Sequence, residues 1–237
     1  MVITDHNTYN GYRYWKNHMK GKVHTDFVVL KGMNMIQEMQ AHSGDHARRV
    51  KMRLLEMRGM PVSLLIDLVH RNGGVLGPAH PCGEKYMSIA NTKKFYQSPE
   101  IMKRFDFIEA YNCCESVASN TGAARLAAKY KKVTTGGSDS HKTGCVGRAY
   151  TILPEPVTCE TELISMIHKK VPFEVGGVQY EKTTKDRIGK VNKVLVYSFW
   201  LYNKGGELIK RRGRKVKMEE EHPIDPIDPI ELYYTGK

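Results

Sequence analysis

The chain has 237 residues, 41% of them hydrophobic, which is enough to form the core of one α/β domain or of two small ones. It has no run of about 18 apolar residues and no basic-then-apolar leader, so we expect a cytoplasmic protein that neither enters a membrane nor is secreted. The net charge of +12 is concentrated in residues 182–217, which hold 12 Lys and Arg against two acidic residues; such a block can bind nucleic acid, but a solvated surface is the more common outcome.

Short apolar runs alternate with longer amphipathic runs over the first 180 residues. We predict strands at Val2 and Ile3 and over residues 25–30, 31–36, 75–81, 106–112, 132–141 and 149–154, and helices over 61–74, 98–105, 118–130 and 159–170. Strands separated by helices are typical of βαβ units, with a parallel sheet and right-handed crossovers. The sequence therefore predicts an α/β domain.

The C-terminal part differs in composition from this pattern. Residues 187–217 could form a helix with an aromatic and aliphatic face, followed by a basic segment, and "HPIDPIDPI" reads as an extended or disordered tail. We therefore divide the chain into a main domain at 1–180, an amphipathic and basic accessory segment at 181–218, and an acidic, Pro-rich tail at 219–237.

Polar clusters follow the apolar runs in "VITDH", "AHP" and "GSDSH". Active sites form at the carboxyl ends of parallel strands, because successive strand ends converge there. On an extended segment, Asp139 and His141 leave the same face and could chelate one ion. Pro81 favours extended geometry at His80, and Asp5 could orient the ring of His6. Three such clusters indicate a metal-centred site.

Other histidines and the cysteines are less informative. His42 and His46, in "QAHSGDHAR", could both reach a site from a loop. We assign the remaining histidines to surface or packing roles: His18, His24, His70, His168 and His222. The five cysteines form no C-x-x-C pair, which argues for reduced thiols, and Cys82, next to the His80 cluster, is expected to be a bystander.

The motifs "ITDHNT", "GPAHP", "DFIEAYN" and "GGSDSH", in this order over roughly residues 2–153, resemble the polymerase and histidinol phosphatase (PHP) family of metal-dependent phosphoesterases. The resemblance implies a distorted (β/α)7 PHP-type barrel with a C-terminal helical and basic extension. It also implies metal ligands at His6, His46, His80, Asp139 and His141, with His42 a competitor of His46. Two or three divalent ions (Mn, Fe or Zn) are then expected.

The chain departs from the family pattern at two points. Family members usually carry a bridging Glu on the second strand, where this chain has Asn34, and Glu38 is a distant substitute. The family also begins with an H-x-H strand and a helix, which do not precede "ITDHNT" here, so the barrel is expected to be incomplete at the N-terminus and the chain to be truncated, a fragment or started at an internal Met.

The resemblance implies hydrolysis of a phosphoester by a metal-activated water, with His80, Asp139 and His141 at the catalytic centre. The substrate would be a phosphorylated small molecule or nucleotide, met by basic residues such as Lys85, Lys142 and Arg148. The chief alternative is a non-catalytic PHP-like module that binds a phosphate ligand, nucleic acid or a protein. A proofreading exonuclease domain is a third interpretation, but nothing in this sequence shows the polymerase that would adjoin it. We expect no membrane partner.

Overall fold

The computed structural model describes residues 1–6, 10–22, 27–34, 49–52, 61–83, 88–140, 143–180, 198, 201 and 232–235. The strands are β1 (Val2–His6), β2 (Leu30–Asn34), β3 (Arg49–Met52), β4 (Phe107–Asn112), β5 (Val133–Gly137), β6 (Ala149–Ile152), β7 (Glu174–Gly177) and β8 (Leu232–Thr235). The α-helices are α1 (Asn10–Tyr14), α3 (Val62–Arg71), α4 (Lys93–Gln97), α5 (Val117–Tyr130) and α6 (Glu160–His168). Short helices of other types are η1 (Trp15–Met19), η2 (Ile89–Asn91), η3 (Pro99–Arg104) and η4 (Thr143–Cys145).

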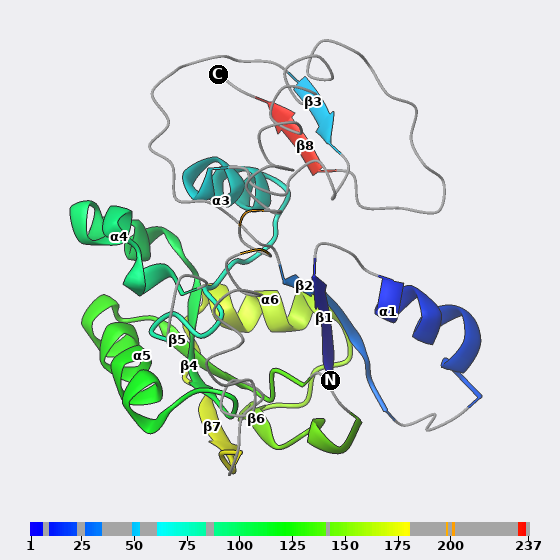
Figure 1. Ribbon diagram of the computed structural model, residues 1–237. Coiled ribbons are helices and arrows are strands. Elements are labelled where there is room, and N and C mark those ends of the chain that lie inside the picture. The colour runs from blue at the N-terminus through cyan, green and yellow to red at the C-terminus, as the bar shows by residue number, and fades with distance from the viewer. Residues whose placement is uncertain are drawn as a thin grey trace.

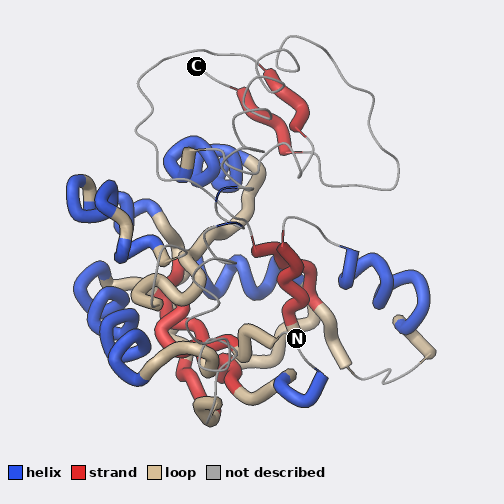
Figure 2. Tube along the Cα trace, in the orientation of Figure 1, coloured by secondary structure: helices blue, strands red, loops and turns tan. Residues whose placement is uncertain are grey.

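The described strands form four pairs rather than one continuous sheet (Figure 1). Strands β1 and β2 are parallel, as are β4 and β5, whereas β6–β7 and β3–β8 are antiparallel. The β4–β5 pair is joined to β6 by a hydrogen bond of 2.9 Å from the backbone N–H of Gly136 to Oγ1 of Thr151. The fold is therefore mixed α/β, and the described strands do not close into a barrel (Figure 2).

Most predicted elements of the main domain are confirmed. The three long helices α3, α5 and α6 form where the apolar periodicity predicts them, and β4, β5 and β6 lie within the predicted strands. Residues 98–105 contain a short helix of the 3-10 type. Residues 75–81 form no strand, so that prediction is wrong, and so is the strand predicted at 25–30 over its described residues 27–29. Strand β2 (Leu30–Asn34) instead falls mainly within the strand predicted at 31–36.

The position of β2 follows from a close approach of two backbones. Lys31 pairs with Ile3 and Gly32 with Thr4 in the β1–β2 register. A Cβ atom at Gly32 would lie 2.6 Å from the Val2 side chain and 2.9 Å from that of Thr4, so a larger residue would push the strands apart. The glycine thus fixes the pairing, whereas the preceding apolar residues Val29 and Leu30 supply buried surface.

The main core lies between α3, α5, η3 and β4. It contains seven buried residues: Val62, Ile66, Phe95, Met102, Phe105, Ile108 and Ala127. A second core cluster of Val133, Ile167 and Phe173 packs β5 against α6. Burying this much apolar surface is the main force that holds the helices against the β4–β5 pair.

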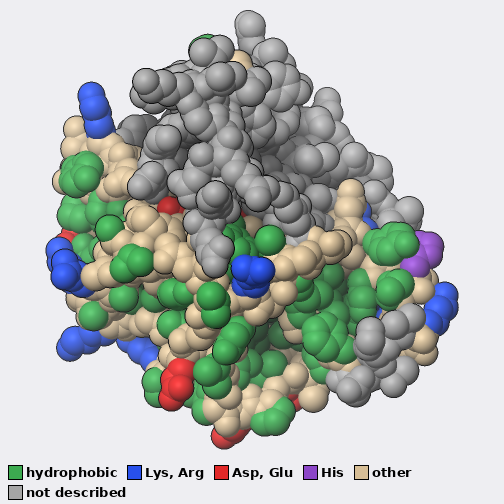
Figure 3. Space-filling view, turned by 60° about the horizontal axis from the view of Figure 1, so that its bottom comes forward, with side chains coloured by type: hydrophobic (Ala, Val, Ile, Leu, Met, Phe, Trp, Pro, Cys, Tyr) green, Lys and Arg blue, Asp and Glu red, His purple; other side chains and the backbone are tan. Residues whose placement is uncertain are grey.

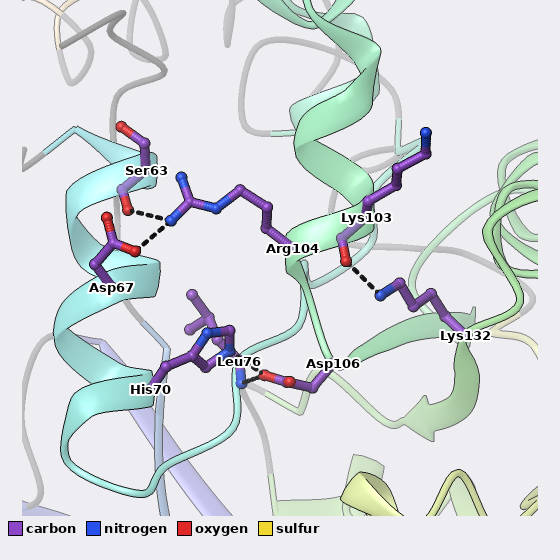
Figure 4. Close-up of polar contacts among 8 residues, drawn as sticks. All are labelled: Ser63, Asp67, His70, Leu76, Lys103, Arg104, Asp106 and Lys132. Carbon is purple, nitrogen blue, oxygen red and sulfur yellow. Dashed lines mark hydrogen bonds and ion pairs between the residues drawn. The ribbon is translucent and has the colours of Figure 1, made fainter. Parts of the chain in front are cut away.

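Polar contacts also join α3 to the segment that precedes β4 (Figure 4). Oδ2 of Asp106 accepts hydrogen bonds from the backbone N–H of Leu76, at 2.8 Å, and from Nε2 of His70, at 2.9 Å. Arg104 donates to Oδ1 of Asp67, at 2.5 Å, and to the carbonyl of Ser63, at 3.2 Å. Asp106 therefore ties the end of α3 and the start of β4 to the same segment, residues 75–78.

Two predictions concern the C-terminal part of the chain. Strand β8 lies in the tail that we expected to be extended or disordered, and it pairs with β3. The accessory helix predicted within 187–217 lies almost wholly outside the described residues.

None of the helices in the described ranges is long and apolar enough to cross a membrane.

Candidate functional site

The site is built around the carboxyl ends of β4 and β5. Asn112, the last residue of β4, pairs with Gly137, the last residue of β5, so both strands end at the same edge. The segment that carries His80 runs beside β4, because the backbone N–H of Glu109 donates to the carbonyl of Pro78 at 3.4 Å. Two candidate ligands distant in sequence, His80 and Asp139, are thus brought to one edge, as parallel strand ends predict.

Glu109 is the central side chain of this edge. Its Oε2 atom accepts hydrogen bonds from the backbone N–H of His80, at 2.6 Å, and from Nδ2 of Asn112, at 3.1 Å. Its Oε1 atom lies over Gly137, where an added Cβ would be 2.5 Å away. Glycine is therefore required at position 137 for the carboxylate to occupy this place.

Burial raises the pKa of the Glu109 carboxyl above its ordinary value, because desolvation disfavours the charged form. The hydrogen bonds from His80 and Asn112 act in the opposite direction, and the nearby carboxylate of Asp139 acts in the same direction as burial. A cation beside Glu109 would offset the cost of its charge. The electrostatic environment therefore favours either a proton or a positive ion at this position.

Asn112 holds the Glu109 carboxylate in place. It is 1% exposed, and its Oδ1 atom accepts from the backbone N–H of Cys114 at 2.9 Å. Its backbone is clamped by Asn120 of α5, which accepts from the Asn112 N–H and donates to the Asn112 carbonyl, both at 3.0 Å. Every polar group of Asn112 is thus used, and the amide has no freedom to turn away from Glu109.

The backbone is strained at two of the candidate ligands. His80 has a φ of 32° and Asp139 a φ of 43°, in the left-handed region that non-glycine residues rarely adopt. The extended geometry predicted at both residues is therefore wrong, and β5 ends at Gly137, before Asp139. The two other described non-glycine residues with positive φ, Lys131 and Lys170, directly follow or lie near the ends of α5 and α6. Strain away from helix ends is typical of functional sites, where surrounding contacts hold a residue in an unfavourable conformation.

The loop that carries Asp139 is held by sulfur and hydroxyl donors. The carbonyl of Ser138 accepts from Sγ of Cys113 at 3.2 Å and from the hydroxyl of Tyr180 at 2.9 Å. The carbonyl of Asp139 accepts from Sγ of Cys114 at 3.5 Å. Burial and the neighbouring thiols raise the pKa of Tyr180, so its hydroxyl stays protonated and continues to donate.

Arg148, the one described residue of the three expected to contact substrate phosphate, lies near this loop. Its guanidinium carbon is 5.5 Å from the ring centre of Tyr180, a cation–π distance. Together with Gly147, Tyr150, Gly177 and Val178 it lines a pocket of about 380 Å³. Arg148 is thus linked to the Asp139 loop through Tyr180, at an exposed position that a phosphate could reach.

A second strand edge carries the other polar cluster. His6 ends β1 and Asn34 ends β2, and the two are register partners in the parallel pair. Asn34, which stands where the resemblance implies a carboxylate, is therefore next to His6 along the same edge. The side chains of Asp5 and His6, and all of Lys85, His42, His46, His141 and Lys142, lie outside the described residues.

The described residues test the expected metal site only in part. Of the five expected ligands, His80 and Asp139 are described with their side chains, and both are close enough to Glu109 to shift its pKa. Among the side chains that are described, no three His, Cys, Asp or Glu residues form a group that could hold a metal ion. Imidazole and carboxylate are nonetheless donor types that suit Mn, Fe and Zn.

Sequence reasoning did not assign Glu109, Asn112 or Tyr180 to the site, although "DFIEAYN" was one of the motifs. A signal was present for Glu109. It is the single charged residue within β4, in the middle of the strand between the buried residues Ile108 and Ala110. A carboxylate at such a place requires a partner, because burying an unpaired charge is costly.

Comparisons with known proteins give one match. Residues 118–172, from α5 through α6, match a family model described as PHP-associated. The match includes β5 and Asp139, and it overlaps the C-terminal part of the motifs noted in the sequence. Neither the curated proteins nor the solved structures contain a significant match to the chain.

Proposed function

The chain is related to the PHP family, and on this premise we propose that it is a metal-dependent hydrolase of phosphoesters, a phosphatase or a phosphodiesterase. The observation that carries the proposal is the contact between Glu109 and His80, beside Asp139. The Glu109 carboxylate is held by the backbone N–H of His80 in an environment that disfavours its charge, and the side chains of His80 and Asp139 are close enough to affect its pKa. A cation beside it would offset the cost of that charge. The predicted cytoplasmic location is part of this proposal.

We propose that two or three divalent ions (Mn, Fe or Zn) are held by His6, His46, His80, Asp139 and His141. Bound there, the ions would supply activation of water and neutralisation of charge on phosphate oxygens. The chain's own contribution begins with positioning: Glu109 holds the backbone of His80, and the Ser138 and Asp139 carbonyls are held by Tyr180 and Cys114. These contacts fix the two described ligands before any substrate binds.

The proposed substrate is a phosphorylated small molecule or a nucleotide. Arg148 is exposed in a pocket beside the Asp139 loop, and its guanidinium offers paired N–H donors that match phosphate oxygens. Lys85 is the second proposed phosphate contact. The parallel β1–β2 and β4–β5 pairs, the latter with α5 as its crossover, support the further proposal that the domain is a PHP-type (β/α)7 barrel.

A non-catalytic PHP-like module is the second candidate, and one observation favours it. Asn34 is the register partner of His6 at the carboxyl end of the β1–β2 pair, where the family resemblance implies a bridging carboxylate. A neutral amide would bind a bridging pair of cations more weakly than a carboxylate does. Such a module would bind a phosphate ligand without turning it over.

The decisive experiment combines metal content with turnover. The purified chain is analysed for Mn, Fe and Zn by mass spectrometry and then assayed with an aryl phosphate monoester and diester, with and without added Mn²⁺. We expect metal-dependent turnover that falls by at least about 100-fold in His80→Ala and Asp139→Asn, since each change removes a proposed ligand. Glu155→Gln is the matched control, because Glu155 is an exposed carboxylate that is none of the proposed ligands.

Two outcomes would contradict the proposal in different ways. Bound metal without turnover of either ester, together with binding of inorganic phosphate, would support the non-catalytic module. A folded chain that binds no metal and hydrolyses neither ester would contradict the proposal that it is a metal-dependent hydrolase. Equal activity in His80→Ala, Asp139→Asn and the Glu155→Gln control would show that any hydrolysis arises elsewhere.

A further inference from the structure

The helical segment α1–η1, residues 10–19, carries aromatic and basic side chains without any acidic residue. Its sequence "NGYRYWKNHM" is followed by Lys20 and Lys22, and no Asp or Glu occurs from position 10 to position 22. Figure 1 shows α1 at the outer side of the molecule, beyond β1 and β2. In Figure 3 a histidine side chain lies beside hydrophobic and basic side chains at the right edge of the described surface.

The aromatic residues of this segment fall into two groups. Tyr12 faces the body of the protein, since burial and the nearby carboxylate of Glu160 in α6 both raise its pKa. Its ring lies 5.8 Å from that of Trp15. Both residues of this inner pair are partly buried, in contrast to Tyr14 and His18.

The outer group consists of Tyr14 and His18. Their ring centres are 4.7 Å apart with 35° between the ring planes, as expected for residues four positions apart on one helical face. Tyr14 is 63% exposed and His18 is also exposed. The exposed ring of Tyr14 offers a flat face on which a base could stack.

Positive charge lies on the same segment as this ring pair. Lys16, Lys20 and Lys22 are all exposed, and the ammonium group of Lys20 lies 5.9 Å from the ring centre of Trp15. Aromatic faces among lysines are typical of surfaces that bind single-stranded nucleic acid, where bases stack on rings and phosphates contact cations. A membrane surface fits less well, because the helical residues 10–19 contain one aliphatic side chain, Met19, and lack the apolar stripe that interfacial helices insert.

We propose that the outer face of α1–η1 binds single-stranded nucleic acid, with a base stacked on Tyr14 and phosphates on Lys16, Lys20 and Lys22. Duplex is excluded as the preferred partner, because its bases are already stacked and their faces are not accessible to a ring. The surface follows directly after β1, whose carboxyl end carries His6. The binding itself requires no metal and does not depend on the hydrolysis proposed above.

The test measures fluorescence anisotropy of labelled 12-nucleotide single strands of RNA and DNA, in EDTA so that metal-dependent hydrolysis cannot occur. A duplex of the same sequence and vesicles of phosphatidylcholine and phosphatidylserine are measured in parallel. We expect single strands to bind with the highest affinity. Tyr14→Ala should weaken this binding roughly tenfold, since base–aromatic stacking is lost.

The lysines are tested by salt dependence. With Lys16, Lys20 and Lys22 all changed to Gln, the slope of log binding constant against log salt should become less negative by about 2, as expected for three phosphate contacts to a single strand. Tyr96→Ala is the aromatic control, because Tyr96 is 72% exposed on α4, in another part of the fold. Lys93→Gln with Lys169→Gln is the charge control, since both lysines are exposed outside this segment.

Three results would overturn the proposal. Single strands and duplex could bind equally, with no effect of Tyr14→Ala, which would indicate non-specific attraction to other basic residues. Vesicles could bind and lose affinity in the Tyr14 and Lys variants while oligonucleotides do not bind, which would identify a membrane surface. Absence of binding to every probe would show that the segment is not a nucleic-acid or lipid surface. Circular dichroism of each variant confirms that the exposed changes leave the fold intact.

Discussion

The backbone N–H of His80 donates a hydrogen bond of 2.6 Å to Oε2 of Glu109 across 29 residues of sequence. This bond connects a segment without regular structure to the central strand of the site. A hydrogen bond to a carboxylate is stronger than one between neutral groups, and this one is partly buried. The strained backbone of His80 is therefore held by a contact that sequence analysis did not assign.

The pH dependence of stability should reveal Glu109 in the metal-free chain. Its pKa is raised above 4.5 in the folded state, so folding favours the protonated form; the resulting stabilisation is present below pH 4.5 and lost as the pH rises through the folded pKa. Glu109→Gln cannot ionise. We expect the variant to gain free energy of unfolding relative to wild type as the pH rises from about 4 towards 7, measured by urea denaturation in EDTA.

The matched comparison uses Glu155→Gln, which should show no such trend because its carboxylate is exposed. A difference between Glu109→Gln and wild type that stays constant from pH 4 to pH 8 would mean that the folded protein does not disfavour the charge on Glu109.

Gly137→Ala should displace the Glu109 carboxylate. The added Cβ would lie 2.5 Å from Oε1, too close for an unstrained contact, and nearby Asn112 has no freedom to yield. We expect a loss of about 1–3 kcal/mol in the free energy of unfolding and weaker binding of Mn²⁺. Denaturation and metal titration measure the two effects.

Gly144→Ala is the control for this substitution, because an added Cβ there meets no atom within 4 Å. The prediction fails if Gly137→Ala and Gly144→Ala have the same stability and the same metal affinity.

Asp106→Ala should destabilise the junction of α3 and β4 (Figure 4). The substitution leaves the backbone N–H of Leu76 without its hydrogen-bond acceptor and removes the carboxylate that accepts from Nε2 of His70. Because the Asp106 side chain is only 16% exposed, we expect a cost of about 1–3 kcal/mol in the free energy of unfolding. Thermal and urea denaturation provide the measurement.

Asp67→Ala serves as the comparison for Asp106→Ala. It breaks the ion pair with Arg104, but both side chains are more than a third exposed, so the expected cost is below about 1 kcal/mol. A larger loss in Asp67→Ala than in Asp106→Ala would contradict this ranking.

The periodic part of the fold could be predicted because it depends on local sequence pattern. Helix α3 buries Val62, Leu65, Ile66 and Leu68 at helical spacing, and α5 begins at Ser116, whose hydroxyl accepts from the backbone N–H of Ser119. Such signals lie within one segment. They give no information on which strand pairs with which, and the antiparallel β6–β7 pair was not predicted.

There is a physical reason why residues 75–81 do not form the predicted strand. Pro78 and Pro81 have no N–H to donate, and an added Cβ at Gly77 would meet the ring of Phe107 and the Phe107 carbonyl. The segment therefore runs along β4 with isolated hydrogen bonds, such as that from Asp106 to the carbonyl of Leu76, instead of a ladder. The apolar residues that suggested a strand are packed in the core nonetheless.

The candidate site was predicted to the extent that its residues stand in short motifs. His80 and Asp139 were assigned from "AHP" and "GSDSH", and both lie at the edge formed by β4 and β5. Glu109, Asn112 and Tyr180 act through contacts with residues distant in sequence, including the bond from Tyr180 to Ser138 across 42 positions. Contacts of that kind depend on the tertiary structure.

Equilibrium binding of Mn²⁺, followed by electron paramagnetic resonance of the free ion, tests the central claim most directly. If His80 and Asp139 belong to one metal site that Glu109 supports, His80→Ala, Asp139→Asn and Glu109→Gln will each weaken binding by about 10- to 100-fold, while Glu155→Gln will match wild type. A folded chain that binds no Mn²⁺, or that binds it equally well in all four variants, would contradict the account.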